Sequence, residues 1–237
     1  MPSHPLRLLL IVVGAVLAAR PMLAAQITIV PTSSISTDVQ GQGNAHVVTS
    51  LPASSSVGSN NGNSQVLAVY DLTNSGFLVE WSLARNATGS MGIRFTLDTD
   101  ATYQLEGALT VTQAHGVNLL GSLYESRFAG DPSRYLLHSQ QISSSTLDES
   151  FVLGGSGGDA SNLLFGSLTG TLVAGREYVV GGTAQLSGGP GVGSAAVGNG
   201  SFRITFTFVP EPGSAALLGA GIALLAARRR ATERSAH

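Results

Sequence analysis

Apolar and polar residues alternate with a period of two along most of the central part of the chain, and this pattern constrains the fold more than any other feature. The clearest examples are residues 77–84, 91–98, 103–112 and 201–208. A period of two places successive side chains on opposite faces of a strand, so each of these segments has one apolar and one polar face. Antiparallel sheets that are covered on one side have this pattern. The sequence therefore predicts an all-β body.

Shorter apolar runs bounded by turn residues extend the prediction to about ten strands. They lie at residues 27–30, 66–72, 117–125, 135–139, 151–153, 163–168 and 177–186. For residues 26–208 we predict an antiparallel two-sheet sandwich that is jelly-roll-like, with a closed barrel as the alternative. Two segments rich in Ser, Asn and Gly, residues 50–64 and 187–200, are expected to be long loops.

The composition excludes several classes of protein. The chain has no cysteine, so a disulfide framework, a thiolate zinc site and a cysteine nucleophile are impossible. All 12 basic residues are arginines, and charged residues make up only 11% of the chain. Residues 26–208 contain six arginines and twelve acidic residues, a net charge of −6. We therefore expect no nucleic-acid partner.

The N-terminal segment has the features of a secretory signal peptide. Arg7 precedes an apolar run at residues 8–19, and small residues follow up to Ala25. A helix of twelve residues is about 18 Å long, which is shorter than the roughly 30 Å of a hydrocarbon core. We predict a signal helix within residues 1–25 that is cleaved after Ala25. Cleavage near Ala18 and an uncleaved anchor are the alternatives.

A second apolar segment, residues 213–227, lies near the C-terminus. It follows a Val-Pro-Glu-Pro sequence and precedes three arginines. A helix of fifteen residues is about 22 Å long, so it predicts a short membrane helix with snorkelling arginines. The positive-inside rule places these arginines in the cytoplasm and the body outside. We treat residues 209–237 as a separate sorting and anchor segment.

These three C-terminal parts, in this order, resemble the PEP-CTERM sorting signal of Gram-negative bacteria that produce exopolysaccharide. The resemblance covers only about the last 25 residues, from Val209 onward. It implies export across the inner membrane, transient anchoring by the C-terminal helix and processing by an exosortase. By the same resemblance, the recognition element is Val209, Pro210, Glu211 and Pro212, and the membrane stop is Arg228, Arg229 and Arg230. An ordinary tail anchor is the alternative.

Several short motifs resemble catalytic or cofactor sites, but none has the context that it requires. Residues 154–158 match G-x-S-x-G, yet the only histidine after Ser156 is His237, whereas this class of hydrolase needs a histidine after the serine. The same glycines form one isolated copy of a calcium-binding repeat, and residues 191–196 lack the βαβ unit of a dinucleotide site. We therefore expect no enzyme activity and no cofactor.

Candidate ligands for a metal ion are few. His46, His115 and His138 are far apart in the sequence, so a histidine metal site is not expected. Asp98 and Asp100 lie between two predicted strands, where they could bind calcium or a glycan, or simply form a turn. We favour the turn. A second acidic pair, Asp148 and Glu149, gives a weaker signal, although the two pairs could meet at one end of a sandwich.

Two functions remain after these exclusions. The first is a non-catalytic protein of the cell surface or extracellular matrix, sorted during exopolysaccharide or biofilm formation. The second is a carbohydrate-binding or carbohydrate-active module. Trp81 and Tyr103 could stack on a sugar, but both fall on the apolar phase of their strands and are expected in the core. A groove with exposed aromatic residues and paired carboxylates would favour the second function.

Overall fold

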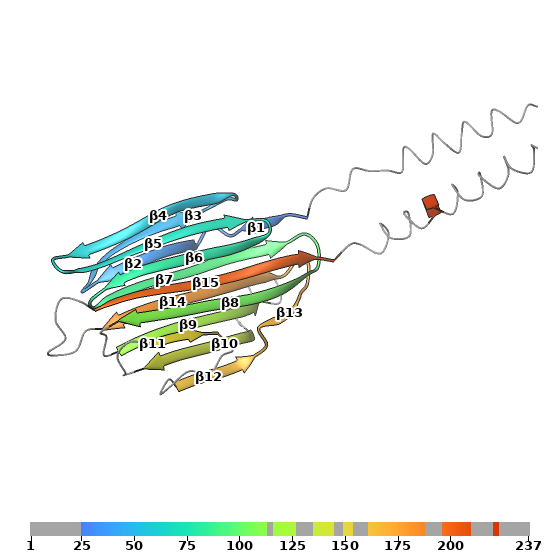
Figure 1. The fold of residues 1–237 in the computed structure, drawn as a ribbon. Coiled ribbons are helices and arrows are strands. Elements are labelled where there is room, and N and C mark those ends of the chain that lie inside the picture. The colour runs from blue at the N-terminus through green and yellow to red at the C-terminus, as the bar shows by residue number, and fades with distance from the viewer. Residues whose placement is uncertain are drawn as a thin grey trace, which may run out of the picture.

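The computed structural model describes residues 25–112, 116–126, 135–144, 149–153, 161–187, 196–209 and 220–222 of the chain. The body is all-β, with two antiparallel sheets (Figure 1). Its strands are β1 (Ile27–Ile29), β2 (Ser33–Val39), β3 (Gln42–Val48), β4 (Ala53–Asn61), β5 (Ser64–Thr73), β6 (Gly76–Ala84), β7 (Ala87–Leu97), β8 (Ala101–Thr112), β9 (Gly116–Ser126), β10 (Tyr135–Ser144), β11 (Glu149–Val152), β12 (Ser161–Gly166), β13 (Thr169–Leu172), β14 (Glu177–Ser187) and β15 (Val197–Phe208).

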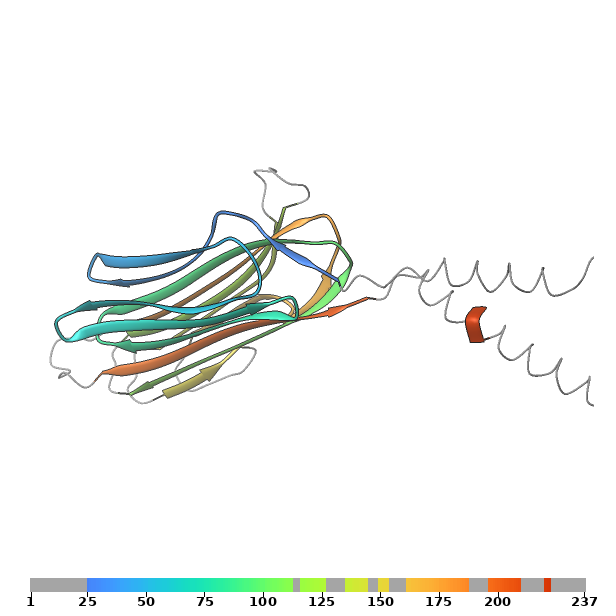
Figure 2. The ribbon, with the colours of Figure 1, turned by 90° about the horizontal axis from the view of Figure 1, so that it is seen from above.

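The two sheets, here called A and B, form a β-sandwich. Sheet A has the strand order β12-β10-β9-β14-β7-β2-β3, and β1 also pairs with β7. Sheet B has the order β11-β8-β15-β6-β5-β4, and β13 also pairs with β8. Seen from above, one sheet lies over the other (Figure 2). In the described residues, no strand of sheet A pairs with a strand of sheet B. The sandwich prediction is therefore confirmed, and the alternative prediction of a closed barrel is wrong. The jelly-roll-like strand order stays a prediction.

The alternation in the sequence produces the core between the sheets. In β7 every second residue from Ala87 to Leu97 is buried. Phe77 of sheet B lies edge-on to Phe95 of sheet A, with ring centroids 5.2 Å apart. Phe206 lies 5.3 Å from each of these rings, and Tyr178 lies 5.7 Å from Phe95. Aromatic pairs of this kind add about 0.5–1.5 kcal/mol to the effect of burial alone, so this cluster helps to hold the sheets together.

Trp81 of β6 occupies a slot between the sheets that is lined by glycines. It is only 2% exposed. A Cβ atom at Gly89 of β7 would overlap the indole ring, and one at Gly182 of β14 would lie 3.1 Å from Cη2. A Cβ atom at Gly200 of β15 would lie 3.5 Å from Cε3. Trp81 and Tyr103, which is 6% exposed, are thus core residues as predicted.

The edge of sheet A at β2 and β3 is joined by side chains to the edge of sheet B at β4. Thr37 Oγ1 lies 2.8 Å from Ser59 Oγ in a buried hydrogen bond, and Asn44 Nδ2 donates to the carbonyl oxygen of Gly58. The prediction of a loop at residues 50–64 is therefore wrong, because residues 53–61 form β4 and pair with β5. An edge strand is held by main-chain hydrogen bonds, and much of β4 is exposed, so its Ser, Asn and Gly residues are tolerated.

Other boundaries also differ from the sequence predictions. Of the predicted loop at 187–200, Ser187 still belongs to β14 and residues from Val197 onward belong to β15; residues 188–195 lie outside the described part. The strands β2, β3 and β13 were not predicted, because their sequences are too polar or too short to show a clear alternation. All the predicted strands are present, although some bounds differ: β10 extends to Ser144, beyond the predicted 135–139.

The two terminal segments fall almost wholly outside the described residues. Residues 1–24, with the predicted signal helix, are among those not described, and within 213–227 only Ala220, Gly221 and Ile222 are described, as helical. None of the helices in the described part of the chain has the length and apolar character needed to cross a bilayer.

Candidate functional site

Both ends of the body lie at one end of the sandwich, beside the turn between β7 and β8. β1 begins at Ile27, which pairs with Leu97, and β15 ends at Phe208, which pairs with Ala101. Because Leu97 and Ala101 flank the same turn, the chain enters sheet A and leaves sheet B at neighbouring points (Figures 1 and 2). We call this region the exit end and define it by Gln26, Asp98, Thr99, Asp100 and Val209.

Asp98 holds the N-terminal side of the exit end. Its carboxylate atom Oδ1 accepts a 2.8 Å hydrogen bond from the main-chain nitrogen of Gln26. In return, the main-chain nitrogen of Asp98 donates to the carbonyl oxygen of Gln26 at 3.2 Å. Thr99 Oγ1 donates to the same Oδ1 atom at 2.8 Å. Gln26, the residue after the predicted cleavage site, is therefore fixed on both sides of its α-carbon.

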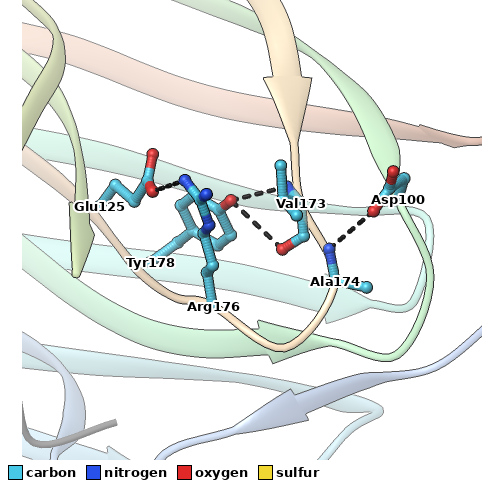
Figure 3. Close-up of polar contacts among 6 residues, drawn as sticks. All are labelled: Asp100, Glu125, Val173, Ala174, Arg176 and Tyr178. Atoms are coloured by element: carbon cyan, nitrogen blue, oxygen red, sulfur yellow. Dashed lines mark hydrogen bonds and ion pairs between the residues drawn. The ribbon is translucent and has the colours of Figure 1, made fainter. Parts of the chain in front are cut away.

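Asp100 holds the C-terminal side of the same region. Its carbonyl oxygen accepts a 2.8 Å hydrogen bond from the main-chain nitrogen of Val209. Its carboxylate atom Oδ1 accepts a 2.8 Å bond from the main-chain nitrogen of Ala174, in the turn between β13 and β14 (Figure 3). The two aspartates thus bind three segments that are far apart in the sequence.

The turn that Asp100 contacts is itself fixed by Tyr178. The Tyr178 hydroxyl accepts a 2.7 Å bond from the main-chain nitrogen of Val173 and donates to its carbonyl oxygen at 3.3 Å (Figure 3). Burial raises the pKa of Tyr178, and the hydrogen bond from Val173 opposes this in part. Arg176 forms an ion pair with Glu125. Gly175 has the positive φ of 76° that this turn requires.

The predicted sorting residues lie mostly beyond the described chain. Val209 is described and 43% exposed, whereas Pro210, Glu211, Pro212, Arg228, Arg229 and Arg230 fall outside the described residues. Ala25, the predicted cleavage position, is described and partly buried. The roles assigned to these residues stay predictions.

The structure favours the turn interpretation of Asp98 and Asp100. Both residues lie between β7 and β8, and each carboxylate accepts from the main-chain amide of a segment 72 or 74 residues away. Among the described residues, no group of three or more His, Asp or Glu side chains lies together as a metal site would need. Residues 148 and 154–160, with their acidic and glycine-rich motifs, lie outside the described part.

Of the three histidines considered as ligands, two are described and they lie in different environments. His46 is exposed, and its ring lies 5.6 Å from that of Tyr70. His138 is fully buried on β10, and neither of its ring nitrogens has a hydrogen-bond partner of good geometry. Burial lowers the pKa of His138, and the nearby Ser167 backbone opposes this only in part. His115 is outside the described residues.

A shallow groove of about 420 Å³ crosses the outer face of sheet B. Strand register places Leu67, Ser82, Asn199 and Thr110 in one row across four strands. Val69, Glu80, Ser201 and Ala108 form the adjacent row. Leu67 and Val69 are 46% and 45% exposed, so part of this surface is apolar.

The groove lacks the features expected of a glycosidase. Its lining includes one carboxylate, Glu80, and one aromatic residue, Trp81, whose side chain is buried. Glycosidases use two carboxylates on either side of the bond that they cleave. The described lining offers neither this pair nor an aromatic surface on which a sugar could stack. Sequence reasoning missed the groove, because it depends on the register between distant strands.

Residues 208–230 match a protein-family model described as the PEP-CTERM protein-sorting motif. The chain therefore carries a PEP-CTERM motif. The matched segment begins at Phe208, the last residue of β15. The PEP-CTERM motif and the folded body thus meet at the exit end, where Asp100 binds Val209. No curated protein is similar enough in sequence to be reported as a relative.

Similarity to solved structures is weak. A structure from a study of promiscuous carbohydrate-binding modules of the β-sandwich superfamily is 8% identical, with a TM-score of 0.29, and covers 77% of this chain and 86% of its own. TmCBM61 in complex with β-1,4-galactotriose is 12% identical, with a TM-score of 0.22 and coverages of 65% and 88%. A structure of infectious bursal disease virus is 11% identical, with a TM-score of 0.24 and coverages of 82% and 60%. Scores this low carry no argument about the function of this chain.

Proposed function

We propose that this protein is an exported, non-catalytic protein of the cell surface or extracellular matrix. A signal peptide directs it across the inner membrane, and its C-terminal segment holds the body outside until an exosortase processes the tail. Its final location is the surface or the exopolysaccharide matrix of a Gram-negative bacterium. The proposal gives the body a structural or interaction role in biofilm-associated sorting.

The PEP-CTERM motif at residues 208–230 is the observation that carries this proposal. The geometry supports it, because Val209 is bound to Asp100 and the recognition element follows directly after β15. Pro210 directly follows Val209 in the sequence. An enzyme that acts on Pro210, Glu211 and Pro212 would therefore act next to the exit end. The net charge of −6 in residues 26–208 also disfavours electrostatic binding of the body to anionic membranes.

Substitution of the glutamate in the recognition element tests the proposal. In the bacterium that makes the protein, Glu211→Ala should leave export intact and block removal of the tail. Glu233→Ala, a change of the same kind beyond the arginines, is the matched control and should be processed normally. Mass spectrometry of the membrane and surface fractions measures the tail. Surface-located wild-type protein that retains residues 213–237 would contradict processing, as would normal processing of Glu211→Ala.

The groove on sheet B supports a second candidate, a carbohydrate-binding role. Its exposed Leu67 and Val69 lie beside the hydroxyl and amide groups of Ser82, Ser201 and Asn199. A glycan screen with the exported protein tests this role, with Ser201→Trp as a variant that fills the groove. Binding that this variant abolishes would favour the second candidate. Absence of binding to any glycan, including the exopolysaccharide of the producing strain, would leave the structural role.

A further inference from the structure

Signal-peptide cleavage after Ala25 creates a new charge at the exit end. Water adds its hydroxyl group to the carbonyl carbon of Ala25 and a proton to the nitrogen of Gln26. The released peptide then ends in a carboxylate, and the body begins with an α-ammonium group at neutral pH. The nitrogen that gains this charge already lies 2.8 Å from Asp98 Oδ1.

We propose that Asp98 is the binding site for the N-terminus of the mature protein. Cleavage converts an amide hydrogen bond into an ion pair at the same place, so processing reinforces the fold where the sorting tail leaves the body. This inference rests on the export step of the proposed function and is independent of tail processing. It adds a role for Asp98 that neither the turn nor the calcium interpretation contains.

The main chain holds the two partners in position. The reciprocal hydrogen bond from Asp98 N to Gln26 O measures 3.2 Å, and Ile27 N donates to Asn74 Oδ1 at 3.3 Å. The side chains of Ile27 and Ile29 are buried in the core, at 6% and 4% exposure. An ion pair between long surface side chains loses conformational entropy when it forms. Here the cation is a main-chain atom that the fold already fixes, so this loss is small.

The other charged groups described at this end have partners elsewhere. Arg94 of β7 lies 3.5 Å from Glu177 of β14, and Arg176 pairs with Glu125 of β9. The carboxylate of Asp100 accepts from the nitrogen of Ala174. Among the described residues at this end, the α-ammonium group of Gln26 is therefore the cation in position to pair with Asp98.

An N-terminal glutamine offers a direct chemical probe of this contact. Its free amine attacks the carbonyl carbon of its own side-chain amide, the amide nitrogen leaves as ammonia, and a neutral pyroglutamyl lactam remains. The attack requires the lone pair of the unprotonated amine. An ammonium group paired with Asp98 lacks that lone pair, so the contact should slow cyclisation and raise the pKa of the α-amino group.

The experiment uses the exported mature protein, and mass spectrometry first establishes its N-terminal residue. Loss of ammonia from Gln26 is then followed over time across a range of pH. We expect Asp98→Asn to cyclise about twofold to fivefold faster than the wild type near neutral pH, the size of an exposed ion pair. Asp71→Asn makes the same change of charge at an exposed position of β5, away from the Gln26 contact, and should cyclise at the wild-type rate.

The possible results distinguish failure of this inference from failure of the proposed function. Equal rates in the wild type and Asp98→Asn would overturn the inference and leave export untouched. If Asp98→Asn does not fold, the wild-type pH profile decides, since a midpoint within the ordinary α-amino range of about 7.7–8.0 would overturn it. An exported protein that begins at a residue other than Gln26 would also refute it. A protein that is not exported and retains residues 1–25 would instead contradict the proposed function.

Discussion

The main-chain nitrogen of Val209 donates a 2.8 Å hydrogen bond to the carbonyl oxygen of Asp100. This bond joins the first residue after β15 to the turn that also binds Gln26 through Asp98. The predicted signal-peptidase site and the PEP-CTERM motif therefore lie at the same end of the body. Neither site is separated from the sandwich by a linker, since Gln26 and Val209 both belong to its hydrogen-bond network.

Asp100→Ala should destabilise the exit end. The substitution removes the acceptor for the nitrogen of Ala174 and leaves the carbonyl oxygen that binds Val209 in place. We expect a loss of about 1 kcal/mol in the free energy of unfolding, measured by urea denaturation. Asp71→Ala removes an exposed carboxylate of β5 and should change stability by less than about 0.5 kcal/mol. If the two substitutions lowered the free energy of unfolding equally, the hydrogen bond to Ala174 would not contribute to stability beyond an exposed carboxylate.

Gly89→Ala should destabilise the sandwich through its core. The added Cβ would overlap the Trp81 indole, which is confined between the sheets. Overpacking of this kind costs about 1–3 kcal/mol. Gly92→Ala on the same strand is the matched control, because a Cβ there meets no atom within 4 Å. Thermal unfolding followed by circular dichroism compares the two, and a Gly92→Ala variant as unstable as Gly89→Ala would contradict the glycine-slot explanation.

His138 should make the protein sensitive to acid. Because burial lowers its pKa below the ordinary 6.5, the folded state favours the neutral ring. This contribution to stability is present above about pH 6.5 and is lost as the pH falls through the lowered folded value. We expect His138→Gln to flatten the decline in stability below pH 6.5, measured by urea unfolding at several pH values. The control His46→Gln removes an exposed imidazole and should retain the wild-type slope.

Tyr178→Phe should loosen the turn between β13 and β14. The change removes the hydroxyl that binds both main-chain groups of Val173 and leaves a partly buried amide unsatisfied, at a cost of about 1–3 kcal/mol. Tyr124→Phe, which removes the hydroxyl of a half-buried tyrosine on β9, is the control. Hydrogen exchange at the amide of Val173 provides a local measurement. Unchanged protection of this amide in Tyr178→Phe would refute the role of the hydroxyl.

Alkaline conditions test the same residue through its ionisation. Burial raises the pKa of both Tyr178 and Tyr103 above the ordinary 10.0. Stability from the protonated phenols is therefore complete below about pH 10 and is lost as the pH rises through the raised folded values. Tyr178→Phe should therefore lose less stability than the wild type as the pH rises above about 10. An equal loss in both proteins would assign the alkaline sensitivity to other groups.

The fold could be predicted wherever a strand has one apolar and one polar face. β6, β7, β8 and β15 are examples, because each contributes alternate residues to a single core. β4 could not be predicted, because an edge strand that is half exposed can consist of Ser, Gly and Asn. It forms a strand because it pairs with β5, and this pairing cannot be predicted from the local composition.

The exit end could be predicted only in part. The sequence predicts a turn at Asp98 and Asp100, but their partners Gln26 and Ala174 lie 72 and 74 residues away. Those contacts depend on the register of both sheets. The contacts between Trp81 and its neighbouring glycines could not be predicted either. Gly89, Gly182 and Gly200 lie on three different strands and come close to the indole ring only in the folded sandwich.

The burial of Trp81 also gives the protein an internal optical reporter. It is the single tryptophan of the entire chain, and it lies 2% exposed between sheets A and B. Its fluorescence therefore originates from one point at the contact between the sheets, whether or not the terminal segments are attached. A red shift in the emission of the purified protein would report separation of the two layers.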